Sequence, residues 1–206
     1  MAVQKEKESG RRSGLDGYKH WGSGRRCEGR AMAPMTPSKV ATVEELSFRP
    51  IVESDIALVE EWLQDAESKR RLGGMIPFRP CFEYQQSKPG YHKWIVYHAD
   101  TPVALTGFEI QEDGSAAVVL LVSPRRRGRG YGSCVLKALA SVPEAQKVTT
   151  FVGLVEADHE VAIRCLEAAG YTEEGPDPED PGFTRYVLTR KDYPTRPSSR
   201  RQGRRG

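Results

Sequence analysis

The chain has 206 residues, of which 38% are hydrophobic and 29% charged, with a formal net charge of +3. This length allows one domain with a sizeable core, and no segment approaches the roughly 20 consecutive apolar residues of a membrane span. The first thirty residues have basic charges but no apolar stretch, which argues against a secretory signal. The four cysteines lack metal-ligand spacing, so we expect reduced thiols, no metal site and a cytoplasmic protein.

The positive charge is confined to the two ends of the chain. Residues 1–40 contain nine Lys or Arg and four Asp or Glu, and residues 191–206 contain six and one. Of the 31 basic and 28 acidic residues in the chain, residues 41–190 therefore hold 16 and 23, a net charge of −7. Polar, glycine-rich basic ends are typical of disorder, whereas an acidic body favours a cationic partner over nucleic acid.

The charge distribution predicts one folded domain with two extensions. We predict disordered basic segments at residues 1–43 and 191–206 around a domain at residues 44–190. Translation could begin at Met1, Met32 or Met35, because a domain-like pattern starts only after the last two.

The first half of the predicted domain combines a strand with helices. Residues 46–50 alternate like a short strand that ends at a proline. The stretch at residues 53–72 predicts one helix with Ser54 as its N-cap, and its apolar face contains Ile56, Val59 and Leu63. Pro80 can open a second short helix.

The second half begins with a predicted antiparallel meander of strands at residues 93–98, 102–110 and 116–122. The third strand is apolar throughout, which predicts burial on both faces. The further predicted elements are a helix at residues 131–141, a strand at 147–155, a helix at 158–170 with Asp158 as N-cap, a polar loop at 172–182 and a strand at 183–189. This βα(α)βββαβαβ order predicts an α+β fold with a mixed, mostly antiparallel sheet.

The stretch "LLVSPRRRGRGYGS" at residues 120–133 predicts a strand, a glycine-rich turn and a helix. A helix N-terminus presents backbone N–H groups and a positive dipole to an anion, and glycines let that backbone approach closely. Arginines at positions 125, 126, 127 and 129 can neutralise several phosphate charges. The glycine spacing fits neither the Rossmann fingerprint nor the P-loop, so the turn predicts a different pyrophosphate ligand.

Two motifs carry a resemblance to a known family. "RGRGYG" at residues 127–132 resembles the R/Q-x-x-G-x-G/A acetyl-CoA signature of the GNAT superfamily of N-acetyltransferases. "HEVAIRCLEAAGY" at residues 159–171 is similar to the second family signature, and the order of predicted strands agrees from Leu46 to Thr189. The first half is similar to the branch with ribosomal-protein N-terminal and aminoglycoside acetyltransferases.

The resemblance implies a splayed parallel pair of strands, with the pantetheine arm of acetyl-CoA between them and its pyrophosphate on the N–H groups of residues 128–133. It also implies that backbone groups of Leu120, Leu121 and Val122 lack strand partners and can bind the ligand. The expected acetyl-CoA-binding residues are Leu120, Leu121, Val122, Arg127, Gly128, Arg129, Gly130, Tyr131, Gly132, Ser133 and His159.

The chain departs from the family pattern at several positions. His159 stands where the family has Asn, and Leu166 stands where many members have a tyrosine that protonates the departing thiolate. The positions of the acidic bases of some members are occupied by Ala116 and Leu154.

Candidates for a water-mediated base are therefore Glu109, Glu156, Asp158 and His159. Each also has a structural interpretation, as a solvent-facing strand residue, a loop charge, an N-cap and a surface histidine.

We therefore expect an acetyl-CoA-dependent acyltransferase that moves an acetyl group to a primary amine of a small molecule or a peptide N-terminus by direct attack. The acceptor is expected to be cationic, and the protein is expected to be a monomer or a homodimer without membrane attachment. Two alternatives stay open: a CoA-binding module without catalysis, and nucleic-acid binding through the basic ends.

Overall fold

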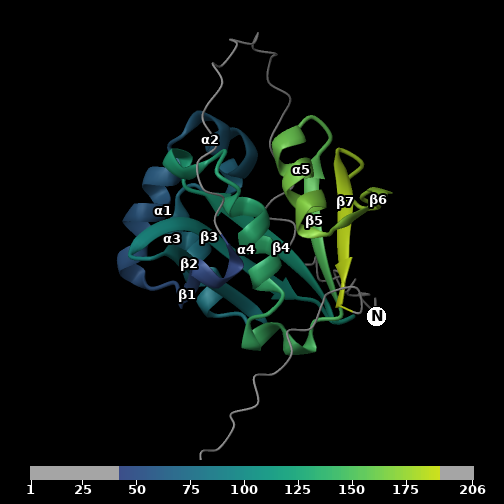
Figure 1. Cartoon of the computed structure of the whole chain (residues 1–206), viewed down its shortest axis with the longest axis horizontal. Helices are drawn as coiled ribbons and strands as arrows, with labels where there is room; N and C mark the ends of the chain where they lie inside the picture. Colours follow the sequence, from purple (N-terminus) through teal and green to yellow (C-terminus); the bar gives the residue numbers. More distant parts are fainter. Residues whose placement is uncertain (1–41, 191–206) are drawn as a thin grey trace, which may run out of the picture. The chain divides into compact units, whose positions relative to one another are not determined.

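The computed structural model describes residues 42–190. The predicted extensions, apart from residues 42 and 43, and the candidate start sites therefore lie outside the described residues. The described chain forms two compact units. The helical unit consists of residues 52–87, and the sheet unit consists of residues 42–51 together with residues 88–190. Figure 1 labels the helices and strands of both units.

The helical unit contains α1 (Ile56–Leu63), α2 (Ala66–Leu72) and α3 (Phe78–Gln86). Its buried face in α1 includes the predicted Ile56, Val59 and Leu63. The prediction of one continuous helix is wrong, because the side chain of Asp65 accepts a hydrogen bond from the Ser68 N–H at 3.1 Å and starts a new helix.

The start of α1 also differs from the prediction. Asp55, not Ser54, is the N-cap residue of α1, and its carboxylate accepts a hydrogen bond from the Val52 N–H at 2.9 Å. Ser54 lies inside the short 3-10 helix Glu53–Asp55.

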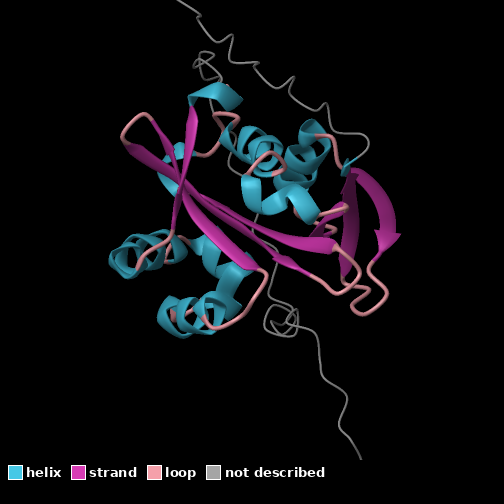
Figure 2. Cartoon of the chain, turned by 90° about the horizontal axis from the view of Figure 1, so that it is seen from below, coloured by secondary structure: helices cyan, strands magenta, loops and turns pink. Residues whose placement is uncertain are grey.

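The sheet unit is built on seven strands in the order β1-β2-β3-β4-β5-β7-β6. Figure 2 shows the sheet with its strands in magenta. Their bounds are β1 Leu46–Pro50, β2 Tyr91–His98, β3 Thr101–Ile110, β4 Ser115–Val122, β5 Thr150–Glu156, β6 Thr172–Pro176 and β7 Phe183–Thr189. Only β4 and β5 pair in parallel, which confirms the predicted mixed, mostly antiparallel sheet.

The strand β6 corrects the prediction of a polar loop at residues 172–182. Its residues are mostly exposed, because β6 lies at the edge of the sheet and pairs only with β7. A polar edge strand lacks the apolar alternation by which strands are recognised in a sequence.

Two helices of the sheet unit, α4 (Tyr131–Leu139) and α5 (Glu160–Ala169), pack on one face of the sheet (Figures 1 and 2). The inner face of α4 is buried, with Val135 and Leu139 fully covered. α5 begins with His159 as N-cap residue instead of the predicted Asp158, and it ends at Gly170, which has the left-handed conformation. No helix in residues 42–190 has the length and apolarity needed to cross a membrane.

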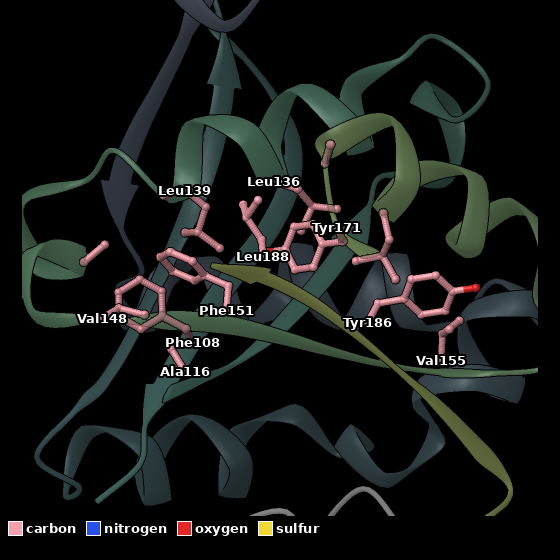
Figure 3. Packing of buried hydrophobic residues seen from close by; sticks show 14 of the residues in the cluster. Phe108, Ala116, Leu136, Leu139, Val148, Phe151, Val155, Tyr171, Tyr186 and Leu188 are labelled. Carbon is pink, nitrogen blue, oxygen red and sulfur yellow. The ribbon is translucent and has the colours of Figure 1, made fainter. Parts of the chain in front are cut away.

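The main core of the sheet unit joins the sheet to these two helices. Figure 3 shows Phe108, Phe151 and Leu188 of the sheet facing Leu136 and Leu139 of α4. The rings of Phe108 and Phe151 meet edge to face, with centroids 6.0 Å apart. Phe108 lies on β3, which pairs with β4, and Phe151 lies on β5. Their contact therefore joins the two halves of the sheet that meet between β4 and β5.

Replacing Phe151 tests the role of this core. Phe151 is 1% exposed, so Phe151→Ala is expected to lower the free energy of unfolding by about 3–5 kcal/mol through lost burial and a cavity. Val161, which is 64% exposed on α5, provides the control, and Val161→Ala is expected to change the same quantity by less than about 0.5 kcal/mol. Urea unfolding followed by circular dichroism measures both. Similar losses for the two variants would contradict the assignment of this core.

Candidate active site

The parallel strands β4 and β5 are paired only at their beginning. The pairs are Ser115 with Thr150, Ala116 with Phe151 and Ala117 with Val152, although both strands continue beyond them. Each strand is paired along this continuation on its other side, β4 with β3 and β5 with β7. The sheet therefore opens between β4 and β5 after Ala117, and we call this opening the seam.

The register decides which backbone groups of β4 face the seam. Ser123 N–H donates to the Val103 carbonyl at 2.9 Å, and Gln111 N–H donates to the Ser115 carbonyl at 2.8 Å. Because hydrogen-bonded and non-bonded positions alternate in an antiparallel pair, odd-numbered residues of β4 direct their N–H and C=O groups to β3. The even-numbered residues direct theirs toward β5, and those that lie clear of the last pair with β5 and face the seam are Leu120 and Val122.

This alternation corrects two expectations for β4. The N–H and C=O of Leu121 are directed to β3, so Leu121 is not part of the open edge. The strand is also not buried on both faces, since only Ala116 and Leu121 are fully buried. Its other residues are half-buried.

Leu166 of α5 fills the inner part of the seam. A Cβ atom added to Gly153 of β5 would lie 2.9 Å from Leu166 Cδ2 and 3.7 Å from Val118 Cγ2. The side chains of Leu166 and Val118 thus converge on the bare backbone of Gly153. The position that corresponds to a tyrosine in the family pattern lies at the seam, and here it is apolar and 7% exposed.

The glycine-rich turn follows the open end of β4. Gly128 and Gly130 have φ values of 71° and 78°, in the left-handed region that glycine adopts without strain. Gly130 is the N-cap residue of α4, so the first N–H groups of this helix lie directly after the turn. Such groups have no partner within a helix and suit an anion.

Gly132 has a different role from the two glycines before it. A Cβ added to Gly132 would lie 2.5 Å from Cys165 Sγ, so this glycine allows α4 to approach α5. Burial raises the pKa of the Cys165 thiol to about 11. The thiol therefore stays protonated near neutral pH and acts as a packing group, not as a nucleophile.

The structure separates the predicted carboxylate bases. Glu109 pairs with Ala117, at the closed end of the seam, and its neighbour Phe108 points to the α4 face, so Glu109 points to the opposite face. Glu156 is the last residue of β5, at the open end. Glu109 and Glu156 are therefore not brought together.

The remaining candidates lie where β5 leads into α5. Asp158 is exposed and His159 is half-buried, and the His159 N–H donates to the Glu156 carbonyl at 2.9 Å. Ala116, at one of the base positions of the family pattern, is fully buried and leaves no room for a carboxylate.

Sequence comparison assigns these features to a family. The acetyltransferase (GNAT) family matches residues 56–171, more than half of the chain, and the match includes both strands of the seam and the turn. The chain belongs to the GNAT acetyltransferase family. This membership makes the protein an acyltransferase, as both motifs predict.

Two curated relatives are named as acetyltransferases. An uncharacterized N-acetyltransferase, YfmK of Bacillus subtilis (strain 168), is 27% identical over 143 residues, which are 68% of this chain and 95% of that protein. Mycothiol acetyltransferase of Stackebrandtia nassauensis is 30% identical over 89 residues, which are 43% of this chain and 29% of that protein.

Solved structures share the GNAT fold at low identity. Aminoglycoside acetyltransferase AAC(6')-Ib, in complex with coenzyme A and kanamycin, has a TM-score of 0.60 at 19% identity, covering 72% of this chain and 96% of its own. Spermidine N-acetyltransferase from Vibrio cholerae, in complex with CoA and spermine, has a TM-score of 0.59 at 15% identity, covering 73% of this chain and 98% of its own. At these identities the likeness confirms the fold alone.

A double substitution tests the contact of the two helices. Gly132→Ala is expected to lower the free energy of unfolding by about 1–3 kcal/mol, because the new methyl group overlaps Cys165 Sγ. Cys165→Ala removes that sulfur. In the Cys165→Ala background, Gly132→Ala is therefore expected to lower the free energy of unfolding much less than it does in the wild type. Additive losses in urea unfolding would contradict this contact.

Proposed function

We propose that the protein transfers the acetyl group of acetyl-CoA to the primary amine of a cationic small molecule or peptide N-terminus. The observation that carries the proposal is the seam, an open strand edge that leads directly into a turn and helix start suited to phosphates. Family membership supports the reaction class, and the geometry of the sheet unit supports the donor.

The donor fits the seam by hydrogen bonding and charge. The pantetheine arm contains amide groups, which can pair with the N–H and C=O groups that Leu120 and Val122 direct into the seam. The diphosphate would lie at the N-terminus of α4, where Gly128 and Gly130 shape the turn. Arg127 and Arg129 are half-buried beside it and supply positive charge.

The reaction is a direct displacement at the thioester carbonyl. The nitrogen lone pair of a neutral amine attacks the carbonyl carbon, a C–N bond forms, and the C–S bond breaks to release CoA as a thiolate. The negative charge that develops on the carbonyl oxygen requires a hydrogen-bond donor, and the backbone N–H group of Leu120 faces the seam. The proton of the amine leaves through water.

Acid and base catalysis from side chains has little support at the seam. Leu166 has no proton to donate, and Ala116 has no carboxylate. Glu156 and His159, at the open end of β5, are the proposed water-mediated base, with Glu109 as a second choice because it points to the other face of the sheet. The departing thiolate would be stabilised by its surroundings instead of by a tyrosine.

The acceptor preference rests on where the acidic residues lie. Residues 156–185, from the end of β5 to β7, contain nine Asp or Glu and two Lys or Arg, a net charge of −7. This equals the whole acidic excess of residues 41–190. A concentrated negative surface attracts a polycationic amine and raises its association rate.

The alternative function is CoA binding without catalysis, and the apolar Leu166 and Ala116 favour it. A panel of amines separates the two functions. Release of CoA thiol is expected with polyamines or aminoglycosides and acetyl-CoA, whereas binding of acetyl-CoA without thiol release across the panel would favour the binding module.

A charge substitution at the turn tests the donor site. A Cβ at Gly128 would meet no atom within 4 Å, and Asp and Asn both tolerate its left-handed φ. Gly128→Asp is expected to weaken acetyl-CoA binding at least about tenfold relative to the isosteric Gly128→Asn, because only the former repels phosphate. Isothermal titration measures both affinities. Equal affinities of the two variants would place the diphosphate elsewhere.

Salt dependence tests the cationic acceptor. The value of kcat/KM for a polyamine is expected to fall several-fold between about 20 and 300 mM NaCl, since salt screens attraction to residues 156–185. A monoamine of similar size provides the control and is expected to respond less. Equal responses of the two amines would argue against electrostatic attraction of the acceptor.

A further inference from the structure

Between Ser123 and Tyr131 the glycine-rich turn has no fully buried residue. A Cβ atom added to Gly128 would have no other atom within 4 Å, and Gly128 and Gly130 have no side chains that could hold the turn. Tyr131, the first residue of α4, is only 6% exposed and packs with Val103 and Val135. The ring of Tyr131 is thus the anchor that holds the helix end of the turn on the core of the sheet unit.

The hydroxyl group of Tyr131 contacts His98. The Tyr131 hydroxyl and His98 Nδ1 are 2.8 Å apart, and the two rings lie with their centroids 5.6 Å apart. His98 is the last residue of β2, paired with Leu46 of β1 and Thr101 of β3. The backbone of His98 is therefore fixed by neighbours on both sides.

A carboxylate completes the chain of contacts. Glu45 Oε2 lies 3.8 Å from His98 Nε2. The same oxygen accepts hydrogen bonds from the N–H and the hydroxyl of Thr42, at 3.1 and 3.0 Å. A carboxylate beside Nε2 favours a proton on that nitrogen, which leaves Nδ1 to accept the hydrogen bond from Tyr131.

We propose that His98, oriented by Glu45, is a positioning residue that holds Tyr131 and thereby the acetyl-CoA diphosphate turn in its binding conformation. This inference rests on the proposed donor site. Neither His98 nor Glu45 touches the donor in this proposal. They act by reducing the motion of the helix end of the turn, so they lower the conformational cost of binding.

Four variants test the chain of contacts. Tyr131→Phe keeps the buried ring and removes only the hydroxyl, and His98→Leu removes the acceptor. His98→Asn places a carbonyl oxygen near the position of Nδ1 and is expected to restore the bond. Tyr97→Phe is the matched control, because Tyr97 is the neighbour of His98 in β2 and its hydroxyl accepts a hydrogen bond from Arg49 Nη2 at 2.7 Å.

The first measurement is hydrogen–deuterium exchange of residues 124–134 in the protein without ligand. Tyr131→Phe and His98→Leu are each expected to speed this exchange about fivefold, the effect of one lost hydrogen bond of ordinary strength. His98→Asn and Tyr97→Phe are expected to stay near the wild type. Unchanged exchange in both Tyr131→Phe and His98→Leu would overturn the inference, whether or not the protein binds acetyl-CoA.

The second measurement separates the donor from the acceptor. Tyr131→Phe and His98→Leu are each expected to raise the KM for acetyl-CoA about fivefold. His98→Leu, which lies outside the binding site, is expected to leave the KM for the amine and kcat unchanged. A fall in kcat with an unchanged KM for acetyl-CoA would overturn the positioning role. Failure of the wild type to bind acetyl-CoA would refute the proposed function, and the exchange experiment would still decide whether His98 orders the turn.

Discussion

The separation of β4 from β5 is the feature on which the rest of the sheet unit depends. Both strands keep their other neighbours along their whole length, so each half of the sheet is complete while the boundary between them opens. An unpaired strand edge inside a protein is costly unless something satisfies it. A ligand with its own amide groups is a natural partner for such an edge.

The seam is closed at one end and held open along its length by different contacts. At the closed end the N–H and the hydroxyl of Thr149 both donate to the Gly114 carbonyl, at 3.0 and 3.1 Å, just before β4 and β5 pair. Further along, Leu166 inserts against Gly153 and Val118. The opening between the two strands is therefore bounded by the paired end and by the side chain of Leu166.

The catalytic logic of the proposal follows from what this opening contains. Backbone N–H groups and the start of a helix can stabilise a developing oxyanion and a bound diphosphate, and neither requires a particular side chain. The apolar Leu166 and Ala116 remove the side-chain acid and base that the family pattern would supply. In the proposed reaction, orientation of the amine and proton transfer through water take the place of these side chains.

Much of the fold could be predicted from the sequence, because the strands of the meander, α4 and β7 have strong local patterns. The glycine-rich turn and the start of α4 at Tyr131 could likewise be predicted, because the preference of glycine for positive φ and the periodicity of a helix depend on residues close together in the sequence. The break between α1 and α2 and the polar strand β6 were missed, since one depends on a side-chain cap and the other on pairing with β7.

By itself the sequence determined the order of elements, the turn and the two family motifs. Only the tertiary structure decided which residues of β4 face the seam and that Gly132 leaves room for Cys165 Sγ. It also decided that His98 contacts both the Tyr131 hydroxyl and the Glu45 carboxylate. The physical reason is the range of the interactions. Backbone conformation and periodicity are set by near neighbours in the chain, whereas register, close approach of helices and hydrogen bonds between distant residues exist only after the chain has folded.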